Sequence, residues 1–426
     1  MDVYLGLGSN SEPRRKNLES ALAALERRGV HVLRLSPVVE SAALLPGGAP
    51  PSWNQPYLNL VAQCGVGCTP QQLLKQIHEI EAALGRHEHE HWSPRPIDID
   101  ILLWGEERIA TDALKIPHEA LTLRNFVLSP LAALSPGLRI PGAGDRTVLQ
   151  HCRALHDHIP LWMGILNVTP DSFSDGGRFT QWPAIQAHVD TMVEAGAQIV
   201  DVGAQSTRPG AKLLSEKEEL ARLVPILERL RDRYAHHGLR PRISVDTYHA
   251  GVARRAVDLG VDMINDVGGL TDPAMIELAT GSQVEWVAMH NLGLPADPSQ
   301  TLPAGSDPCD AVEQWLDVRA EAWSRAGLNP DRVIFDPGIG FGKNPLQSLA
   351  LLRHIERFRR FDLRILVGHS RKSFMQAFVD RDNWDRDLAT IGASMYLCAK
   401  GVDIIRVHNV PAHVAAYRGW SHMVAR

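Results

Sequence analysis

The strongest constraint on the fold is a series of short apolar segments after residue 160, each followed by a stretch with helical spacing of apolar residues. Eight of these segments read as buried strands: Leu161–Val168, Ile199–Gly203, Arg242–Asp246, Met263–Asp266, Trp286–His290, Val333–Asp336, Ile365–Gly368 and Ile404–His408. Eight strand–helix units in about 260 residues match the size and rhythm of a (β/α)8 barrel. The sequence therefore predicts an α/β TIM barrel over residues 161–426.

Polar residues stand near the carboxyl end of nearly every predicted barrel strand, where an apolar core would not place them. They are Asn167, Asp201, Asp246, Asn265, His290, Asp336, Ser370, Arg406 and His408. In such barrels the active site lies at that end. A Rossmann-type sheet is the structural alternative, but it does not need eight polar strand ends.

The first 150 residues have a different pattern, which indicates an α+β domain. Strands are expected at Val3–Leu7, Val30–Leu35, Tyr57–Gln63 and Ile97–Trp104, with amphipathic helices at Pro13–Arg28 and Pro70–Leu84. A chain of 426 residues allows two or three domains. We therefore expect one domain over residues 1–152, a short linker at 153–160, and the barrel over 161–426.

Composition excludes several classes of protein. Hydrophobic residues make up 44% of the chain and no long uncharged apolar run occurs, so neither disorder nor a membrane span is expected. The net charge of -5 argues against non-specific nucleic-acid binding. Five scattered cysteines and no visible targeting segment indicate reduced thiols in the cytoplasm. Cys64 and Cys68 are four residues apart, but no second ligand pair follows at zinc-site spacing.

The clearest chemical motif in the first half is RPIDIDIL, residues 95–102. Side chains alternate across a strand, so Asp98 and Asp100 share one face. Two adjacent carboxylates repel unless cations lie between them, and Mg2+ bound to nucleotide phosphates is the obvious candidate. The alternative is a half-solvated strand with its acids facing water.

Several further motifs occur in order around RPIDIDIL: YLGLGSN at the start, Tyr57-Leu58-Asn59, Glu81 in IEAALGR, Trp92, and IPH followed by Arg124 and Phe126. With them, residues 1–150 resemble 6-hydroxymethyl-7,8-dihydropterin pyrophosphokinase, a ferredoxin-like α+β enzyme. The resemblance implies diphosphate transfer from ATP to the pterin hydroxymethyl group, with release of AMP. Phosphoryl-group transfer depends mainly on positioning and charge neutralisation, which metals and arginines supply.

The same resemblance implies roles for individual residues of this domain. Asp98 and Asp100 hold two Mg2+ ions and act with Arg95 in catalysis, and Tyr57, Asn59 and Phe126 bind the pterin. The residues expected to bind ATP are Glu81, Arg86, Trp92, Arg95, His118 and Arg124.

One segment departs from that family pattern. Where a longer basic loop is usual, this chain has His87-Glu88-His89-Glu90-His91. Alternating histidines bind metals in some proteins, but a solvated, pH-sensitive loop is the favoured interpretation. A kinase rate that depends on pH between 6 and 8 is therefore expected, and His89→Arg tests it.

The barrel half carries its own loop motifs. GILNVTPDSFSDGG, residues 164–177, ends a strand at Asn167, whose amide oxygen suits Mg2+ that already carries an anionic substrate. DVGAQSTRPG, residues 201–210, places Thr207 and Arg208 on a loop, where a guanidinium is suited to phosphate capture. Taken singly, each loop is also explained by turn chemistry.

Together with SVDTYHAG, MINDVGG, FDPGIGFGKN, VGHSRKS and IIRVHNV, these loops make residues 160–426 resemble dihydropteroate synthase. The resemblance implies that the amine of 4-aminobenzoate displaces diphosphate at the pterin methylene carbon, with one Mg2+ held by Asn167. It also implies a homodimer formed through the last helices of the barrel. Lys372, Arg406 and Asp336 are the catalytic residues it implies, and the substrate-binding residues are Thr207, Arg208, Asp246, Asn265, Asp336, Phe341, Ser370, Lys372, Arg406 and His408.

The sequence departs from the synthase pattern in two places. Gln205 stands where an acidic residue commonly precedes the serine, and MHNLG follows the fifth strand; modest kinetic effects are expected.

A pterin barrel used for methyl transfer is disfavoured by Ser370-Arg371-Lys372 and by the leading kinase domain. A non-catalytic pterin-binding protein is disfavoured because Asp98, Asp100 and Asn167 are all present.

Overall fold

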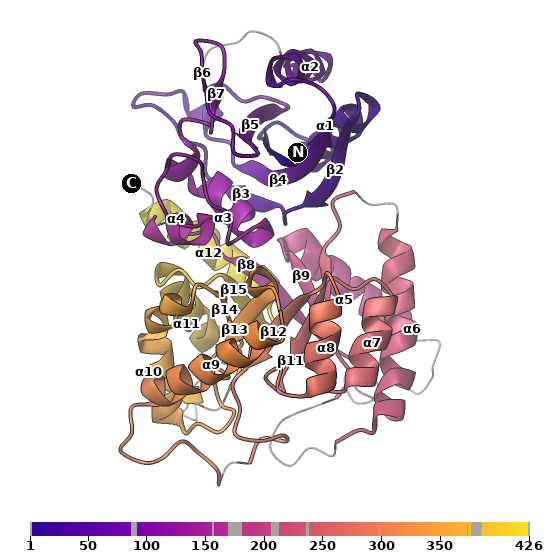
Figure 1. Ribbon diagram of the computed structural model, residues 1–426, viewed down its shortest axis with the longest axis vertical. Coiled ribbons are helices and arrows are strands. Elements are labelled where there is room, and N and C mark those ends of the chain that lie inside the picture. The colour runs from indigo at the N-terminus through magenta and orange to yellow at the C-terminus, as the bar shows by residue number, and fades with distance from the viewer. Residues whose placement is uncertain are drawn as a thin grey trace. The chain divides into compact units, whose positions relative to one another are not determined.

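The computed structural model describes residues 2–86, 92–155, 157–168, 181–205, 213–235, 238–297, 299–372, 374–375 and 386–424. The chain divides into two compact units, Met1–Ile159 and Pro160–Arg426 (Figure 1). The histidine loop at 87–91, the motif residues 169–177, and Thr207 with Arg208 lie outside the described residues.

The first unit is built on an antiparallel sheet with the strand order β2-β4-β1-β5, and β3 pairs with β4. The sheet strands are β1 (Asp2–Ser9), β2 (Val30–Leu35), β3 (Val39–Ser41), β4 (Tyr57–Val66) and β5 (Asp98–Trp104). The remaining elements are α1 (Arg14–Arg27), α2 (Pro70–Ala83), α3 (Asn125–Leu134), α4 (Val148–Ala154), and the short pair β6 (Ile109–Ala110) and β7 (Lys115–Ile116). This architecture confirms the predicted α+β fold.

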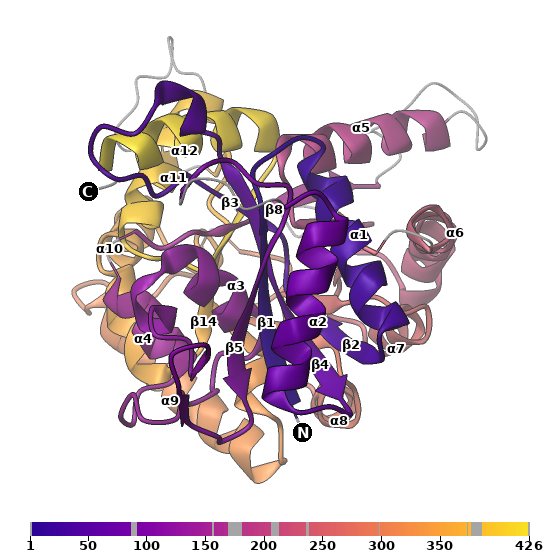
Figure 2. The same ribbon diagram turned by 90° about the horizontal axis from the view of Figure 1, so that it is seen from above.

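Local sequence explains the helices that flank this sheet. Thr69 and Gln72 form a reciprocal capping box at the start of α2, and the helix buries Leu73, Ile77 and Ile80 at helical spacing. Helices α1 and α2 run side by side across the sheet (Figure 2). A separate cluster joins apolar side chains of the sheet to α3 and α4; it includes Val61, Leu102, Leu128, Leu131, Leu149 and Cys152.

The second unit is a closed barrel of eight parallel strands, which confirms the predicted (β/α)8 fold. The strands are β8 (Leu161–Asn167), β9 (Ile199–Gly203), β10 (Arg242–Asp246), β11 (Met263–Asp266), β12 (Glu285–Met289), β13 (Val333–Asp336), β14 (Arg364–Val367) and β15 (Ile404–Val407). The helices are α5 (Gln181–Ala195), α6 (Glu216–Tyr234), α7 (Ala250–Asp258), α8 (Pro273–Gly281), α9 (Pro308–Arg325), α10 (Pro345–Arg353), α11 (Arg386–Ala399) and α12 (Val410–Val424).

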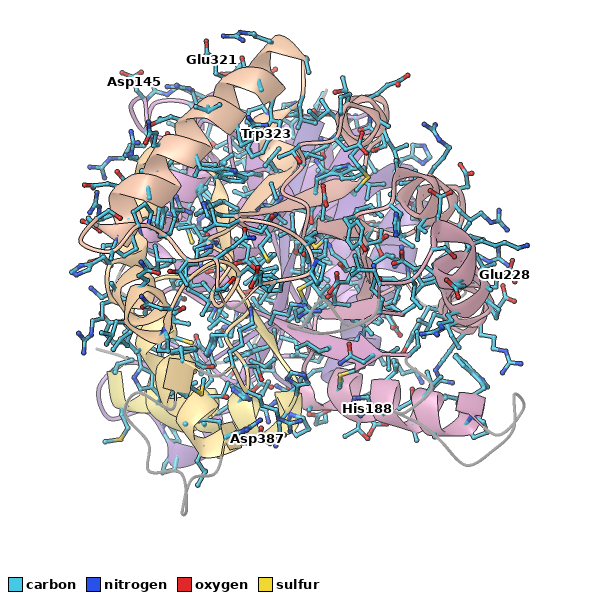
Figure 3. The ribbon with its side chains drawn as sticks, turned by 90° about the horizontal axis from the view of Figure 1, so that it is seen from below. Asp145, His188, Glu228, Glu321, Trp323 and Asp387 are labelled. Carbon is cyan, nitrogen blue, oxygen red and sulfur yellow. The ribbon has the colours of Figure 1, made fainter. Side chains whose placement is uncertain are left out.

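The helices bury their apolar faces against the barrel. In α9, Trp323 points inward and donates its indole N–H to the carbonyl of Leu270 over 3.0 Å, whereas Glu321 points outward (Figure 3). No helix among the described residues is long and apolar enough to cross a membrane.

Strand register brings the polar strand ends together. Asn167 pairs with Gly203, Gly203 pairs with Asp246, and Asp246 pairs with Asn265, so these residues form one level at the carboxyl end of four adjacent strands. Asp336 pairs with Met289 at the corresponding end of β12 and β13. The barrel therefore collects side chains that are distant in sequence at its carboxyl-terminal mouth.

Candidate active sites

In the first unit, paired residues of β4, β1 and β5 form the floor of the candidate site. Asn59 of β4 and Asp98 of β5 both pair with Gly8 of β1, and Asp100 pairs with Gly6. Residues directly opposite in an antiparallel sheet share a face, so Asn59, Asp98 and Asp100 face the same way. The two glycines leave space between these polar groups.

Gly8 is the tighter of the two glycines. A Cβ there would lie 3.0 Å from Oδ1 of Asn59 and 3.5 Å from the ring of Tyr57. Asn59 is held in place because its Nδ2 donates to the hydroxyl of Ser41 over 3.0 Å. The glycine therefore keeps the predicted pterin residues and the carboxylate pair on one open surface.

Two arginines neutralise Asp98. Nη1 of Arg86 lies 2.7 Å from its Oδ1, and Nη1 of Arg95 lies 3.4 Å from its Oδ2. Arg86 also pairs with Glu81, whose Oε1 accepts the backbone N–H of Ile99 over 2.9 Å. Glu81 thereby ties the end of α2 to β5, next to the carboxylates.

Burial governs the protonation of these acids. It raises the pKa of Glu81 to about 7, and Arg86 opposes the rise. Burial, followed by the charge of Asp98, raises the pKa of Asp100, while His118 and Arg124 oppose it. The nearby cations therefore do not offset the burial of Asp100 and its repulsion by Asp98.

The remaining predicted kinase residues surround this floor. Nε2 of His118 lies 4.0 Å from Oδ1 of Asp100, and its Nδ1 accepts the backbone N–H of Ala120 over 3.2 Å. The guanidinium of Arg124 lies 5.8 Å from the ring centroid of Phe126. Burial raises the pKa of Tyr57, and Arg95 opposes the rise. Trp92 is 41% exposed, so its indole is accessible from outside.

In the barrel, Asp201 in the middle of β9 is the centre of a hydrogen-bond network. Its Oδ2 accepts from Nε of Arg406 (2.6 Å) and from Nδ2 of Asn265 (3.1 Å), and its Oδ1 accepts from the hydroxyl of Ser244 (2.6 Å). Nη2 of the Arg406 guanidinium donates to Oδ2 of Asp246 over 2.9 Å. Asp201 was not among the predicted site residues, although its place near the end of a predicted strand was a signal that pointed to it.

The two carboxylates predicted to bind the pterin, those of Asp246 and Asp336, both have raised pKa values. Burial raises the pKa of Asp246 to about 7, opposed by Arg406 and reinforced by Asp201. Burial also raises the pKa of Asp336, opposed by Lys372. Oδ1 of Asp336 accepts the backbone N–H of Gly338 over 2.7 Å, which fixes the orientation of the carboxylate.

Lys372 and Phe341 meet across the barrel mouth. Nζ of Lys372 lies 4.6 Å from the ring centroid of Phe341 and donates to the carbonyl of Ile339 over 2.5 Å. The hydroxyl of Ser370 lies 2.9 Å from Nδ1 of His408 and accepts the backbone N–H of that residue over 3.3 Å. Four predicted residues on the segments that follow β13, β14 and β15 are thus in contact in two pairs at the barrel mouth.

A cation in the described part of the chain would have few protein ligands. No group of three or more His, Cys, Asp or Glu side chains converges there as a metal cluster. Mg2+ is usually bound by one or two carboxylates together with substrate phosphates and water rather than by an all-protein cage. The oxygen donors of Asp98, Asp100 and Asn167 fit that mode of binding.

Comparison with known proteins identifies both units. Residues 4–136 match the family model of 7,8-dihydro-6-hydroxymethylpterin-pyrophosphokinase, and residues 163–408 match that of the pterin binding enzymes. A folate synthesis bifunctional protein of Chlamydia caviae is 36% identical over 439 residues, which cover 98% of each chain. The mitochondrial folate synthesis bifunctional protein of Arabidopsis thaliana is 34% identical over 100% of this chain and 83% of its own.

The chain belongs to the family of bifunctional folate synthesis proteins. Two solved structures of Xanthomonas albilineans dihydropteroate synthase match the barrel. One, with 4-aminobenzoic acid, is 37% identical over 63% of this chain and 94% of its own, with a TM-score of 0.57. The other, in complex with 7,8-dihydropteroate, is 34% identical, with a TM-score of 0.55.

The chain is therefore an enzyme with two activities, as its sequence predicts. It transfers diphosphate from ATP to 6-hydroxymethyl-7,8-dihydropterin, and it condenses the resulting pterin diphosphate with 4-aminobenzoate to give 7,8-dihydropteroate.

Proposed function

We propose that the two activities lie in separate sites on residues 1–152 and 161–426, joined by a linker at 153–160. The kinase site is formed by the carboxylates and arginines around Gly6 and Gly8. The synthase site is formed by the strand-end residues at the barrel mouth. This assignment is supported by the division of the chain into two compact units, each with its own cluster of buried polar residues.

In the kinase site, Asp98 and Asp100 would hold two Mg2+ ions, which would supply positive charge to the ATP phosphates. Bound there, Mg2+ neutralises phosphate charge and aligns the transferred group. Arg86 and Arg95 already contact Asp98, so both can move from the carboxylate to phosphate oxygens when nucleotide binds. Glu81, Trp92, His118 and Arg124 complete the ATP site.

Tyr57, Asn59 and Phe126 form the proposed pterin site of the kinase. Asn59 presents Oδ1 over Gly8, where it accepts the N–H donors on the edge of the pterin. Tyr57 lies beside it, and Phe126 supplies an aromatic face. The hydroxymethyl group of a pterin held there points toward the carboxylates of β5 in the same sheet.

In the synthase site, the acceptors Asp246, Asn265 and Asp336 bind the donor edge of the pterin. Arg406 and His408 bind the diphosphate together with Thr207 and Arg208, and Ser370 orients His408. The leaving diphosphate departs more easily when these cations neutralise its charge. Asn167 would hold one Mg2+ on the same diphosphate.

The remaining residues serve the second substrate. The ring of 4-aminobenzoate packs on Phe341, whose other neighbour is the ammonium of Lys372. Lys372 contacts the pterin as well, so it links the two substrates. The single observation that carries the synthase assignment is the convergence of Asp246, Asp336, Arg406 and Lys372 at one end of the barrel.

The experiment is an assay of the whole chain with ATP, Mg2+, hydroxymethyldihydropterin and 4-aminobenzoate that follows AMP, diphosphate and dihydropteroate separately. Asp98→Ala with Asp100→Ala should abolish AMP formation and leave synthesis from supplied pterin diphosphate intact. Lys372→Ala should do the converse. Loss of both activities in a folded variant would refute the two-site assignment.

A homodimer through the last two barrel helices is part of the proposal. Tyr396 of α11 and Met423 of α12 are 42% and 86% exposed, which supports an apolar contact there. Sedimentation velocity of the chain and of Met423→Glu tests it: a monomeric native chain would refute the dimer. We further propose that the enzyme works in the cytoplasm, which its five cysteines support because none of them forms a disulfide. Cell fractionation tests that location.

A further inference from the structure

Lys343 is a buried lysine directly behind the loop that carries Phe341. Its side chain is only 6% exposed, and it follows the segment Pro337–Gly342 that leaves β13. Nζ lies 2.6 Å from Nδ1 of His290, 3.1 Å from the carbonyl of His290 and 2.9 Å from the carbonyl of Phe341. An ammonium group has three N–H donors and no acceptor, so these three acceptors match it fully.

His290 is held as a neutral acceptor for this ammonium. Its ring is 2% exposed at the end of β12, and it packs edge-on against Trp315 with the ring centroids 5.2 Å apart. Burial, reinforced by the charge of Lys343, lowers the pKa of His290 to about 3. Burial also lowers the pKa of Lys343, while Asp336 opposes that change and Lys372 adds to it.

Two lysines bond to backbone carbonyls of the loop. Lys343 donates to the carbonyl of Phe341, and Lys372 donates to the carbonyl of Ile339. Within the loop, the N–H of Phe341 donates to the carbonyl of Gly338 over 3.0 Å.

The backbone between these contacts needs outside support. Gly338 and Gly340 both have positive φ, at 65° and 81°. Glycine reaches such conformations freely, and it also reaches many others. A loop with this freedom keeps one shape only where contacts from outside select it, which both lysines do.

We propose that Lys343, together with His290, is a positioning residue that sets the place of the 4-aminobenzoate ring by fixing the backbone of Phe341. The inference rests on the proposed packing of that ring on Phe341. Lys343 touches neither substrate in this arrangement. Its effect passes through one carbonyl and should therefore fall on the affinity for the amine substrate rather than on the chemical step.

Lys343→Met tests the proposal in the full chain. Methionine keeps the length of the side chain and removes its donors, leaving two buried carbonyls unpaired. The KM for 4-aminobenzoate should rise about tenfold or more, as expected when a buried charged hydrogen bond is lost. The KM for pterin diphosphate and the kcat should stay within about twofold of the native values.

The chain provides its own controls for this variant. AMP formation by the kinase site reports that the chain is present and intact, and Lys217→Met changes an exposed lysine of α6 that should have no effect. A purely structural role for Lys343 would lower kcat and thermal stability without changing the KM for 4-aminobenzoate. That pattern would overturn the proposal.

A second pair of variants decides the matter if Lys343→Met fails to fold. His290→Asn places an oxygen acceptor near the position of Nδ1 and should keep the native KM, whereas His290→Leu removes the acceptor and should raise the KM for 4-aminobenzoate. Equal KM values for the two variants would overturn the proposal. Phe341→Ala tests the two proposals separately. If it leaves the KM for 4-aminobenzoate unchanged, the proposed ring site is wrong. If it raises that KM while His290→Leu and Lys343→Met have no effect, only the role of Lys343 is refuted.

Discussion

Arg406 donates from Nε to Oδ2 of Asp201 over 2.6 Å, although the two residues are 205 positions apart in the chain. Asp201 is fully buried, and Arg406 also bonds to Asp246. A buried carboxylate needs such a partner because burying an isolated charge is costly. The pair therefore holds the guanidinium at the barrel mouth, where we propose that the diphosphate binds.

Asp201→Asn should disable the synthase while the kinase stays active. Asparagine keeps the shape but removes the charge that orients Arg406, and it leaves that guanidinium in a buried site opposite one carboxylate. Breaking a buried pair costs about 3 kcal/mol or more, so kcat/KM for the synthase should fall about hundredfold. Separate assays of AMP and dihydropteroate formation measure the effect.

Asp232→Asn is the matched control, because Asp232 pairs with Arg231 on the exposed side of α6. It should leave both activities unchanged. A synthase that tolerates Asp201→Asn with less than about threefold loss would show that Arg406 is held by Asp246 alone.

Arg371 gives a second prediction, because it has a left-handed backbone between two site residues. Its φ is 58°, and its guanidinium makes a two-point contact with Asp387, the second residue of α11, at 2.6 and 2.8 Å. Asn409 donates to the same carboxylate over 3.1 Å. The Arg371–Asp387 pair thus stabilises the turn that presents Ser370 and Lys372 to the barrel mouth.

Arg371→Ala and Arg371→Gly separate the pair from the backbone conformation. Both lose the contact with Asp387, but glycine adopts positive φ without strain. The free energy of unfolding of Arg371→Gly should therefore exceed that of Arg371→Ala by about 1 kcal/mol. The glycine variant should accordingly unfold at the higher temperature. Both should lower synthase kcat, and Asp387→Glu should lower it less than Asp387→Asn. Calorimetry showing the alanine variant to be the more stable would contradict this account of the turn.

Gly8 gives a prediction for the kinase. Gly8→Ala would place a Cβ 3.0 Å from Oδ1 of Asn59 and 3.5 Å from the ring of Tyr57. The two side chains must give way, so the KM for the pterin should rise about tenfold or more with a smaller effect on the KM for ATP. Initial rates of AMP formation measure both constants.

Gly67→Ala is the control for this change, since nothing lies within 4 Å of a Cβ at that position. It should leave both KM values and the synthase unchanged. If Gly8→Ala raised the KM for ATP more than that for the pterin, Asn59 and Tyr57 would not be the pterin site.

Strand positions could be predicted closely because they follow from local patterns. The predicted segment Met263–Asp266 is β11, and Leu161–Val168 differs from β8 by one residue. Buried parallel strands are short continuous apolar runs, and their ends are marked by polar residues. Asp98, Asp246 and Asp336 could be singled out for the same reason, since each lies on a predicted strand, whereas Lys372 is implied only by the resemblance to dihydropteroate synthase.

The roles of Asp201 and Lys343 could not be predicted, since they depend on contacts between distant segments. Asp201 has its role only because the barrel closes with β15 beside β8 and β8 beside β9, which brings Arg406 to it. Lys343 lies within the motif FDPGIGFGKN, but its three acceptors come from the end of β12 and from its own loop. Sequence periodicity reports which face is buried and not which partner a buried charge will find.

Glu219 of α6 gives the last prediction, which concerns pH and stability. It is fully buried, and neither carboxylate oxygen has a hydrogen bond of good geometry within the described residues; Nε2 of His249 lies 3.8 Å away. Burial raises its pKa from the ordinary 4.5 to about 7; the hydroxyl of Thr247 opposes the rise, and the charges of Asp246 and Glu216 add to it. The folded state therefore binds this proton more tightly than the unfolded chain does.

The contribution of Glu219 to stability is fully present below about pH 4.5 and is lost as the pH rises through about 7. Because the carboxylate is ionised at pH 8, the contribution of Glu219 to the free energy of unfolding should be about 3 kcal/mol smaller there than at pH 5. Glu219→Gln cannot ionise, so it should raise the unfolding temperature of the barrel at pH 8 and change it little at pH 5. Calorimetry of the two chains at both pH values measures the difference.

Glu285→Gln is the matched comparison because its environment is the reverse. Burial would raise the pKa of Glu285, but Arg242 and Arg364, at 2.8 and 2.9 Å, hold it below its usual value. Its contribution is present above pH 4.5 and lost as the pH falls, so Glu285→Gln should destabilise the barrel at pH 8 and less so in acid. Two buried glutamates in one barrel should thus respond to the same substitution with opposite signs at pH 8. A Glu219→Gln variant that is destabilised at pH 8, as Glu285→Gln is, would show that Glu219 has a cationic partner in the folded chain.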